Sequence, residues 1–277
     1  MAILRILLIF TLCGTSALLA QPKGKGKAKA DPGPPKLKVL IITGINAHDW
    51  KGTTPTLRAT LEETGKFDVR VMEEFRGAGP ETLAPYDLVV INHSGGRIWG
   101  ERGEKAIEDF VASGKGLVLY HFALSGFAGW TEFEKMSGAN WRPEDGDHSP
   151  RHDWTVNIKD TEHPITKGMK DFPVKAEELY ADLRWQPAGT YHVLATAYDD
   201  HALYNGRSGK GHVLEGPGKD ENILWTTQYG KGRVFVTTLG HDAENVKADY
   251  FRVTFARGAE WAATGNVTQP IPVGLAK

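Results

Sequence analysis

The chain has 277 residues, a formal net charge of -1 and 40% hydrophobic residues. This composition is typical of a globular protein and allows one large α/β domain or two small ones. The near-neutral charge argues against a nucleic-acid-binding protein, which would normally carry a basic face. The sequence has no internal repeat and no convincing boundary between two domains.

The first twenty residues have the pattern of a secretory signal peptide: Arg5, an apolar run over Ile6–Leu12, and small residues from Ser16 to Ala20. Such a segment is too short to be a stable transmembrane helix, and it is removed on export. We therefore expect cleavage after Ala20 and an exported protein, periplasmic or extracellular, with no integral membrane segment. The only cysteine, Cys13, would be lost with this segment, so the mature chain would have no disulfide and no thiol chemistry.

Residues 21–36 are rich in Lys, Gly and Pro and offer no apolar side chains for a core. We expect a disordered linker there. The folded domain is then expected to span residues 37–266, with residues 267–277 as a C-terminal tail.

Apolar strands and amphipathic helices alternate from Lys38 onward. Thr53 or Thr54 is expected to cap the first helix, with Pro55 early, where its missing N–H costs little. Strands and helices of this length predict an α/β fold with a parallel, doubly wound sheet. The expected strands are Val39–Thr43, Phe67–Met72, Leu88–Ile91 and Leu117–Tyr120, and the expected helices are Thr54–Thr64 and Glu104–Ser113.

The pattern loosens after Gly129, where Pro and Gly interrupt more alternating segments. We expect additional mixed or antiparallel edge strands in this half. Arg233 is interpreted as a salt-bridged edge residue. The expected elements are a short helix at Trp130–Met136, strands at Thr155–Ile158, Leu179–Leu183 and Val193–Tyr198, a hairpin of Ile223–Thr227 with Val234–Thr238, and a final helix at Tyr250–Thr264.

Polar side chains follow several of the predicted strands. In open parallel sheets, ligands bind beyond the carboxyl ends of the strands. A single histidine there is more often structural, but four at one edge favour a site, where imidazole can act as acid, base or ligand. The residues at these strand ends are His48 and Asp49, His93, His121, and His241 and Asp242.

Two adjacent acidic residues, Glu177 and Glu178, precede Leu179 and Tyr180. In an extended segment, neighbouring side chains point to opposite faces. Glu177 is therefore expected to face solvent, while Glu178 and Tyr180 share a face that could look into the site. A solvated acidic turn is the alternative.

Taken together, several of these segments resemble the ThuA-like (trehalose-utilisation) family over Lys38–Thr264. The resemblance implies a flavodoxin-like, class I glutamine amidotransferase-like fold and a role in the catabolism of disaccharides or related glycosides, including 3-keto sugars. A glutaminase is excluded because His121 and Phe122 stand where that fold carries its nucleophilic Cys. The segments are His48–Asp49–Trp50, Gly114–Lys115–Gly116 with the strand ending at His121, His163–Pro164–Ile165, Glu178–Leu179–Tyr180, and the Gly-Lys-Gly-Arg-Val run leading to Leu239–Gly240–His241–Asp242.

We therefore expect a small carbohydrate substrate, with His121, Glu178 and His241 as catalytic acid–base residues. The residues expected to bind substrate are His48, Asp49, His93, Tyr180, Asp242 and His152, and several tryptophans could stack on sugar faces, namely Trp50, Trp99, Trp130, Trp141 and Trp185. No cofactor is expected. The alternative is a divalent metal ion at Asp147, His148, His152 and Asp153.

Two other functions stay open at this point. One is a non-catalytic carbohydrate-binding protein, and the other is a metal-dependent glycoside hydrolase. The sequence also leaves open the sugar, the bond and the oligomeric state, a homo-oligomer included.

Overall fold

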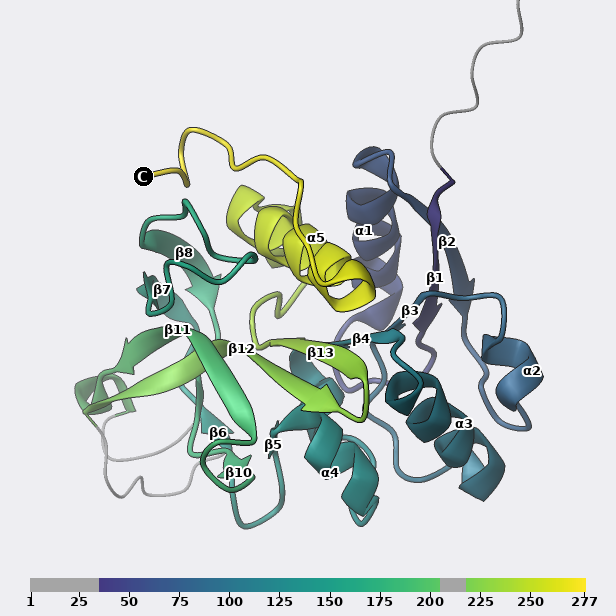
Figure 1. The fold of residues 1–277 in the computed structure, drawn as a ribbon. Helices are drawn as coiled ribbons and strands as arrows, with labels where there is room; N and C mark the ends of the chain where they lie inside the picture. Colours follow the sequence, from purple (N-terminus) through teal and green to yellow (C-terminus); the bar gives the residue numbers. More distant parts are fainter. Residues whose placement is uncertain (1–34, 205–217) are drawn as a thin grey trace, which may run out of the picture. The chain divides into compact units, whose positions relative to one another are not determined.

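A computed structural model describes residues 35–204 and 218–277 (Figure 1). The expected signal peptide and most of the expected linker lie outside the described residues. Within those two ranges, no helix is both long and apolar enough to cross a membrane.

A nine-stranded sheet forms the centre of the domain, in the order β2-β1-β3-β4-β13-β12-β11-β7-β8. The first five strands in this order are parallel, and the remaining neighbours pair antiparallel. The order of the parallel part is that of flavodoxin-like folds. The strands are β1 (Leu37–Ile42), β2 (Phe67–Met72), β3 (Leu88–Ile91), β4 (Gly116–Tyr120), β7 (His152–Ile158), β8 (Phe172–Glu177), β11 (Tyr191–Asp199), β12 (Lys219–Tyr229) and β13 (Gly232–Thr237). The predicted fold class, with parallel strands first and antiparallel strands at one side, is therefore confirmed.

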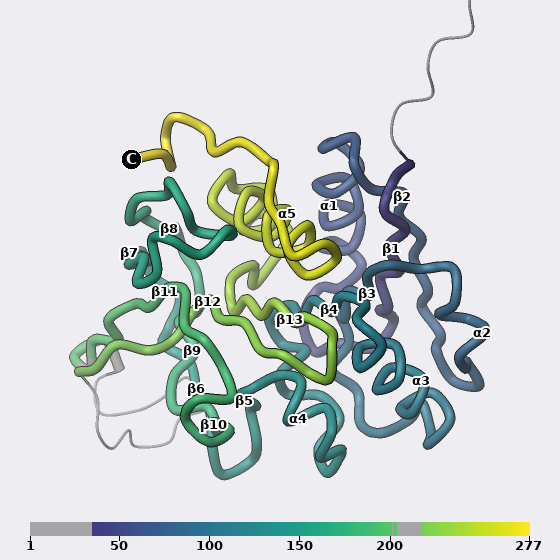
Figure 2. The backbone as a smooth tube through the Cα atoms, in the orientation of Figure 1, coloured from purple at the N-terminus to yellow at the C-terminus, as the bar shows by residue number. Residues whose placement is uncertain are grey.

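Helices cover both faces of the parallel part (Figures 1 and 2). Leu57 and Leu61 of α1 (Trp50–Glu63) pack with Phe251 and Phe255 of α5 (Asp249–Thr264) in the core on one face. The core on the other face takes side chains from α2 (Pro80–Leu83), α3 (Gly100–Ala112) and α4 (Thr131–Ser137). Shorter elements are η1 (His121–Ser125), η2 (His201–Tyr204), η3 (Asn245–Lys247), β5 (Ala139–Asn140), β6 (Asp147–His148), β9 (Tyr180–Ala181) and β10 (Arg184–Trp185).

The start of α1 differs from the prediction. The helix begins at Trp50, and the Asp49 side chain accepts a hydrogen bond of 2.9 Å from the Gly52 backbone N–H. Asp49 therefore caps the helix in place of Thr53 or Thr54, because its carboxylate satisfies a free N–H one turn earlier. Pro55 consequently lies inside the helix.

Arg233 was predicted as a salt-bridged edge residue, but it lies on a central strand and forms no salt bridge within residues 35–204 and 218–277. Its guanidinium donates hydrogen bonds to the backbone carbonyls of Trp261, Ala262 and Ala263 at the end of α5. Carbonyls in the last turn of a helix lack partners within the helix, and a cation there also complements the helix dipole. Arg233 therefore fixes the C-terminal end of α5 to the start of β13.

The segment between β8 and β10 was predicted as one strand, Leu179–Leu183, and β8 itself was missed. Instead, Ala176 has φ 47° and Asp182 has φ 49°, so the backbone turns sharply at both positions. Between these turns the chain forms only the short strand β9, which pairs with β6 in the register His148 with Tyr180. These turns place the segment beside the carboxyl ends of the parallel strands.

The expected C-terminal tail lies against the domain. Leu275 is buried, Ala276 forms a bridge with Met169, and the Arg257 guanidinium donates a hydrogen bond to the Gln269 carbonyl.

Candidate active site

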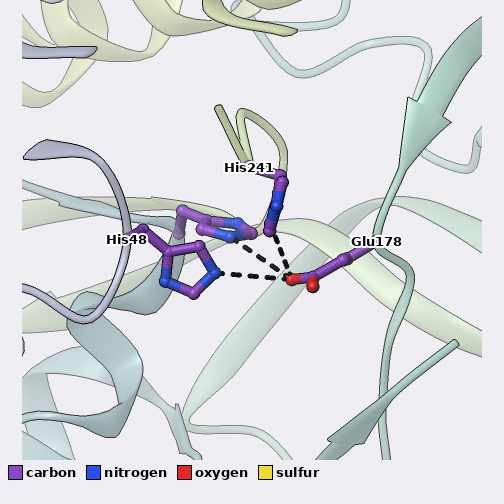
Figure 3. A group of neighbouring side chains, drawn as sticks. His48, Glu178 and His241 are labelled. Atoms are coloured by element: carbon purple, nitrogen blue, oxygen red, sulfur yellow. Dashed lines mark ion pairs between the residues drawn. The ribbon is translucent and has the colours of Figure 1, made fainter. Parts of the chain in front are cut away.

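Three imidazole rings surround the carboxylate of Glu178 (Figure 3). Its Oε2 atom lies 3.5 Å from His48 Nε2, 3.7 Å from His121 Nε2 and 2.9 Å from His241 Nδ1. One potential ligand atom from each of these residues lies within 4.8 Å of those of the other three. We refer to His48, His121, Glu178 and His241 as the histidine–glutamate cluster.

The cluster combines both halves of the sheet. His48 follows β1, His121 follows β4 and His241 follows β13, all at the carboxyl ends of parallel strands. Glu178 follows β8, the outermost strand of the antiparallel part. The structure therefore brings His121, Glu178 and His241 together, with His48 beside them. They lie at the edge of the sheet where open α/β folds bind ligands.

His121 is held in a strained backbone conformation directly after β4. Its φ is 48°, a value that is uncommon for a residue with a side chain and is found at functional sites. Its Nδ1 lies 2.6 Å from the Thr238 carbonyl, so Nδ1–H donates there and Nε2 carries the lone pair toward Glu178. The Tyr180 hydroxyl is 3.1 Å from that Nε2 and donates to it. The ring is 1% exposed, and burial holds its pKa well below the usual value.

The loop that carries His48 is held by amide side chains that were not singled out in the sequence. The His48 backbone N–H donates to Asn46 Oδ1 over 3.0 Å, and Asn46 Nδ2 donates to Asn92 Oδ1 over 2.9 Å. Asn92 in turn donates to the hydroxyls of Thr53 and Thr54 in α1. The position of Asn92, directly after β3, was the only sequence signal for this role.

Glu177 is not exposed to solvent, and that prediction was wrong. The residue is 0% exposed, and its carboxylate accepts hydrogen bonds from the backbone N–H groups of Gly240 at 2.8 Å and His241 at 3.2 Å. The turn at Ala176 breaks the alternation on which the prediction rested, so both acidic residues point inward. Burial raises the pKa of Glu177 to about 7, against the opposing effect of these two hydrogen bonds.

Glu177 also fixes the loop of His241. Gly240 has φ 98° there, and a Cβ atom on it would lie 2.6 Å from the Phe251 ring. The Tyr120 hydroxyl donates a hydrogen bond to the Gly240 carbonyl. Both backbone groups of Gly240 are therefore bound by buried side chains, which orient the next residue, His241, toward Glu178.

The carboxyl group of Glu178 is 10% exposed. Burial opposes its ionisation, but contacts with His241 and His48 and the nearby rings of His121 and His148 outweigh burial and hold its pKa well below the usual value. Among the described residues, every ion pair of Glu178 is with a histidine, and none is with Lys or Arg.

His148 belongs to the site, although the sequence suggested it only as part of a different metal centre. Its Nδ1 lies 3.5 Å from Glu178 Oε1 and donates a hydrogen bond to the Ser149 carbonyl at 2.8 Å. The pairing of β6 with β9 brings it there. The Asp147, His148, His152 and Asp153 centre does not form: His152 Nδ1 lies 2.8 Å from the Pro150 carbonyl, and Asp153 pairs with Lys175.

Three other residues expected to bind substrate lie outside the cluster. Asp49 caps α1, and Asp242 pairs with Arg151 at 2.7 Å and accepts hydrogen bonds from two backbone N–H groups near η3. His93 is buried, with its ring centroid 5.1 Å from Trp99 and 5.4 Å from Phe127. The contacts of these three side chains therefore stabilise the fold, and none of the three is part of the histidine–glutamate cluster.

One of the expected tryptophans borders the site. The Trp141 ring lies 5.0 Å from Tyr180 and 5.7 Å from His148, centroid to centroid. Trp99 and Trp130 lie in the core, and Trp185 packs against Tyr191 and Trp225.

Comparison with protein families explains this combination of fold and strand-end residues. Residues 38–262 match the family described as trehalose utilisation, ThuA. The chain belongs to the ThuA family. No curated protein matches the chain.

Solved structures agree with this assignment. A protein described as ThuA-like from Parabacteroides merdae is 30% identical, with a TM-score of 0.75, over 88% of this chain and 95% of that one. A second ThuA-like protein, from Bacteroides uniformis, is 17% identical with a TM-score of 0.64, over 90% of this chain and 98% of that one. A cytoplasmic protein from Salmonella typhimurium is 17% identical with a TM-score of 0.56, over 82% of this chain and 99% of that one. The last two likenesses, at low identity, concern the fold alone.

Proposed function

We propose that this ThuA-family protein acts on a sugar or glycoside that carries a ketone at C3, by removing the proton from C2. The observation that carries the proposal is the convergence of His48, His121 and His241 on Glu178 at the carboxyl edge of the sheet, in a chain whose family is described as trehalose utilisation. A ketone acidifies the hydrogen on the neighbouring carbon, so proton transfer by imidazole is chemistry suited to such a site.

The reaction needs a base for C2–H and positive charge near the C3 oxygen. His148 suits the role of base because its Nδ1–H donates to the Ser149 carbonyl, which leaves the lone pair on Nε2. Its side chain is 25% exposed, and the rings of His48 and His241 are 18% and 19% exposed, so a substrate can reach all three. His121 is buried behind them and acts through Glu178 and Tyr180.

In the proposed sequence, the C2 proton moves to His148 and the electron pair of the C–H bond forms the C2–C3 double bond of an enediolate. Hydrogen bonds from the N–H groups of the partly exposed His48 and His241 rings stabilise the negative charge on the C3 oxygen. Return of the proton to C3, with transfer of the O2 proton to the C3 oxygen, gives the isomer with its ketone at C2. Expulsion of the glycosidic oxygen from C1, with a proton supplied to it, cleaves the glycoside instead.

The decisive experiment is proton exchange in D2O. The protein is incubated with a disaccharide oxidised at C3, and with the same disaccharide unoxidised, and NMR follows deuterium at C2 and any released sugar. We expect exchange or product with the keto sugar alone, and loss of both in His148→Asn and Glu178→Gln variants. Saturable binding of the keto sugar without exchange or product would overturn the proposal in favour of a carbohydrate-binding protein.

We also propose that the protein is exported, since residues 1–20 have the signal pattern described above. N-terminal sequencing of the native protein is expected to begin near Gln21, in a fraction outside the cytoplasm. A cytosolic protein that retains Met1 would contradict this.

A further inference from the structure

The histidine–glutamate cluster has features that proton transfer does not require. Three rings crowd one carboxylate: the His48 ring centroid is 4.7 Å from that of His121 and 4.8 Å from that of His241. The arrangement therefore brings three imidazole rings and one carboxylate into a small volume.

Hydrogen bonding accounts poorly for this convergence. The His48 and His121 nitrogens lie 3.5 and 3.7 Å from Glu178 Oε2, beyond the usual hydrogen-bond range of about 2.7–3.2 Å. His241 Nδ1 lies at 2.9 Å, yet it is a buried nitrogen without an aligned hydrogen-bond partner. Buried polar atoms without partners call for a specific explanation.

The spacing of the four side chains fits coordination of a single metal ion by all of them. Two donor atoms that each lie about 2.1 Å from a tetrahedral metal ion are about 3.4 Å apart. The three distances from Glu178 Oε2 to the imidazole nitrogens, 2.9, 3.5 and 3.7 Å, lie on both sides of that value. We infer that the histidine–glutamate cluster binds one divalent transition-metal ion, with Zn²⁺ as the reference ion, because three imidazoles and one carboxylate suit such ions better than Ca²⁺ or Mg²⁺.

The surroundings of the cluster resemble the outer shell of a metal site. Histidine ligands usually donate their second N–H to a carbonyl or carboxylate, which orients the ring and raises its basicity. His121 does this with the Thr238 carbonyl, and Glu177 fixes the backbone N–H of His241. The partly exposed sides of His48 and His241 leave room for water or substrate as a fifth ligand beside the four side chains.

One hydrogen bond must change when the ion binds. The Tyr180 hydroxyl now donates to His121 Nε2, the atom that would coordinate the metal. Binding of the ion would therefore deprive the Tyr180 hydroxyl of this acceptor. A Tyr180→Phe variant is therefore expected to bind the metal ion as the unmodified protein does. If the cluster is only hydrogen-bonded, neither protein binds an ion.

This site deepens the proposed function, since a cation would supply the positive charge needed at the C3 oxygen, but metal binding is measured without any sugar. The full chain is purified without a polyhistidine tag, stripped with a chelator, desalted and titrated with Zn²⁺, with Mn²⁺ and Co²⁺ in parallel. Calorimetry gives the affinity, and elemental analysis after a second desalting gives the stoichiometry. We expect one ion per chain, and tetrahedral or five-coordinate absorption bands with Co²⁺.

Variants separate this cluster from the other histidines. Glu178→Gln and His241→Asn are expected to weaken binding by at least about 100-fold, more than the 10–100-fold typical of outer-shell changes. His192→Asn, which removes an exposed ring outside the cluster, is the matched control and keeps full binding. Thermal melting of the metal-free forms checks that each variant is folded. Equal binding by Glu178→Gln and His192→Asn, or less than about one ion per ten chains of the unmodified protein, overturns the site.

The two proposals fail in different ways. If the ion binds as expected but no keto sugar exchanges its C2 proton, the proposed reaction is wrong and the metal site stands. If the stripped protein binds no ion on titration but turns over keto sugars at the full rate, the metal site is wrong and the proposed reaction stands.

Discussion

The chain has two places where histidines gather around an acidic residue, and they differ in what their ring nitrogens contact. In the histidine–glutamate cluster, three rings point at one buried carboxylate, and two Nδ1 atoms have no aligned hydrogen-bond partner. In the second place, His163 and His192 lie beside Asp160, with ring centroids 5.9 Å apart. There His192 Nε2 pairs with Asp160 at 2.7 Å, and His163 Nδ1 accepts the Ile165 backbone N–H at 3.2 Å.

This difference assigns a structural role to the group around Asp160 and a functional role to the histidine–glutamate cluster. In the second group, His192 Nε2 and His163 Nδ1 both have partners within the protein. Asp160 also accepts hydrogen bonds from the backbone N–H groups of Glu162 and His163. That group therefore closes the loop between β7 and β8. The histidine–glutamate cluster instead directs three imidazole nitrogens to one carboxylate at the ligand-binding edge of the sheet. The predictions below test this contrast, from the largest expected effect to the smallest.

The largest effect is expected from the two acidic residues at the centres of the groups. Glu178→Gln removes the charge that four imidazoles face, and acid–base groups typically contribute about 10²–10⁴-fold to rate. We therefore expect kcat/KM on the C3-oxidised disaccharide to fall by about that factor, with little change in melting temperature. Asp160→Asn is the control and is expected to keep activity within about twofold. Similar losses in both variants would erase the proposed distinction.

A second test compares two carboxylates that each accept two backbone N–H groups. Glu177 is fully buried, whereas the Asp160 side chain is 27% exposed. Glu177→Gln retains one acceptor and turns an NH2 group toward a buried N–H, a loss that typically costs about 1–3 kcal/mol. We expect urea denaturation to show that loss of unfolding free energy, together with lower activity because the His241 loop is released. Asp160→Asn should cost less, since water replaces the lost acceptor, and an equal cost would contradict the role of burial.

The same contrast explains how far the sequence could lead. The parallel strands and their terminal histidines were predictable, because each strand is a short apolar run and parallel strands share one carboxyl edge. The ThuA resemblance, predicted over Lys38–Thr264, was confirmed over residues 38–262, the antiparallel half included. The number of histidines that would meet was not predictable, since His93 ends β3 in the same way and is buried among aromatic rings.

The antiparallel half was harder to predict because its geometry depends on turns that leave little trace in the sequence. Ala176 and Asp182 have positive φ values without being glycines, and these turns decide where Glu177, Glu178 and Tyr180 point. The alternation rule was right for Glu178 and Tyr180 and wrong for Glu177. His148 reached the site through a two-residue strand pairing, which no periodicity reveals.

The smallest predicted effect concerns the second histidine group and the pH dependence of stability. Burial of His163, with a further contribution from His192, lowers its pKa from 6.5 to about 4 in the folded protein. The unfolded chain binds a proton at this residue near pH 6.5, so between about pH 6.5 and 4 the unfolded state holds more protons and acid favours unfolding. Below about pH 4 both states are protonated and this contribution stops changing.

A His163→Asn variant isolates that contribution. The Asn side-chain oxygen can accept the Ile165 N–H in place of Nδ1, but it does not titrate. A shift of this size would amount to about 3 kcal/mol for a fully buried ring, and solvent screening of a partly exposed one reduces it to about 1–2 kcal/mol. Urea denaturation of both proteins at pH 7 and pH 4.5 should therefore show a smaller acid-induced loss of stability in the variant. His192→Asn, which leaves the Ile165 contact of His163 in place, should retain most of the acid sensitivity. If His163→Asn and the unmodified protein lose the same stability on acidification, His163 takes up a proton as readily in the folded state as in the unfolded chain. The contrast between the two histidine groups would then no longer hold at this residue.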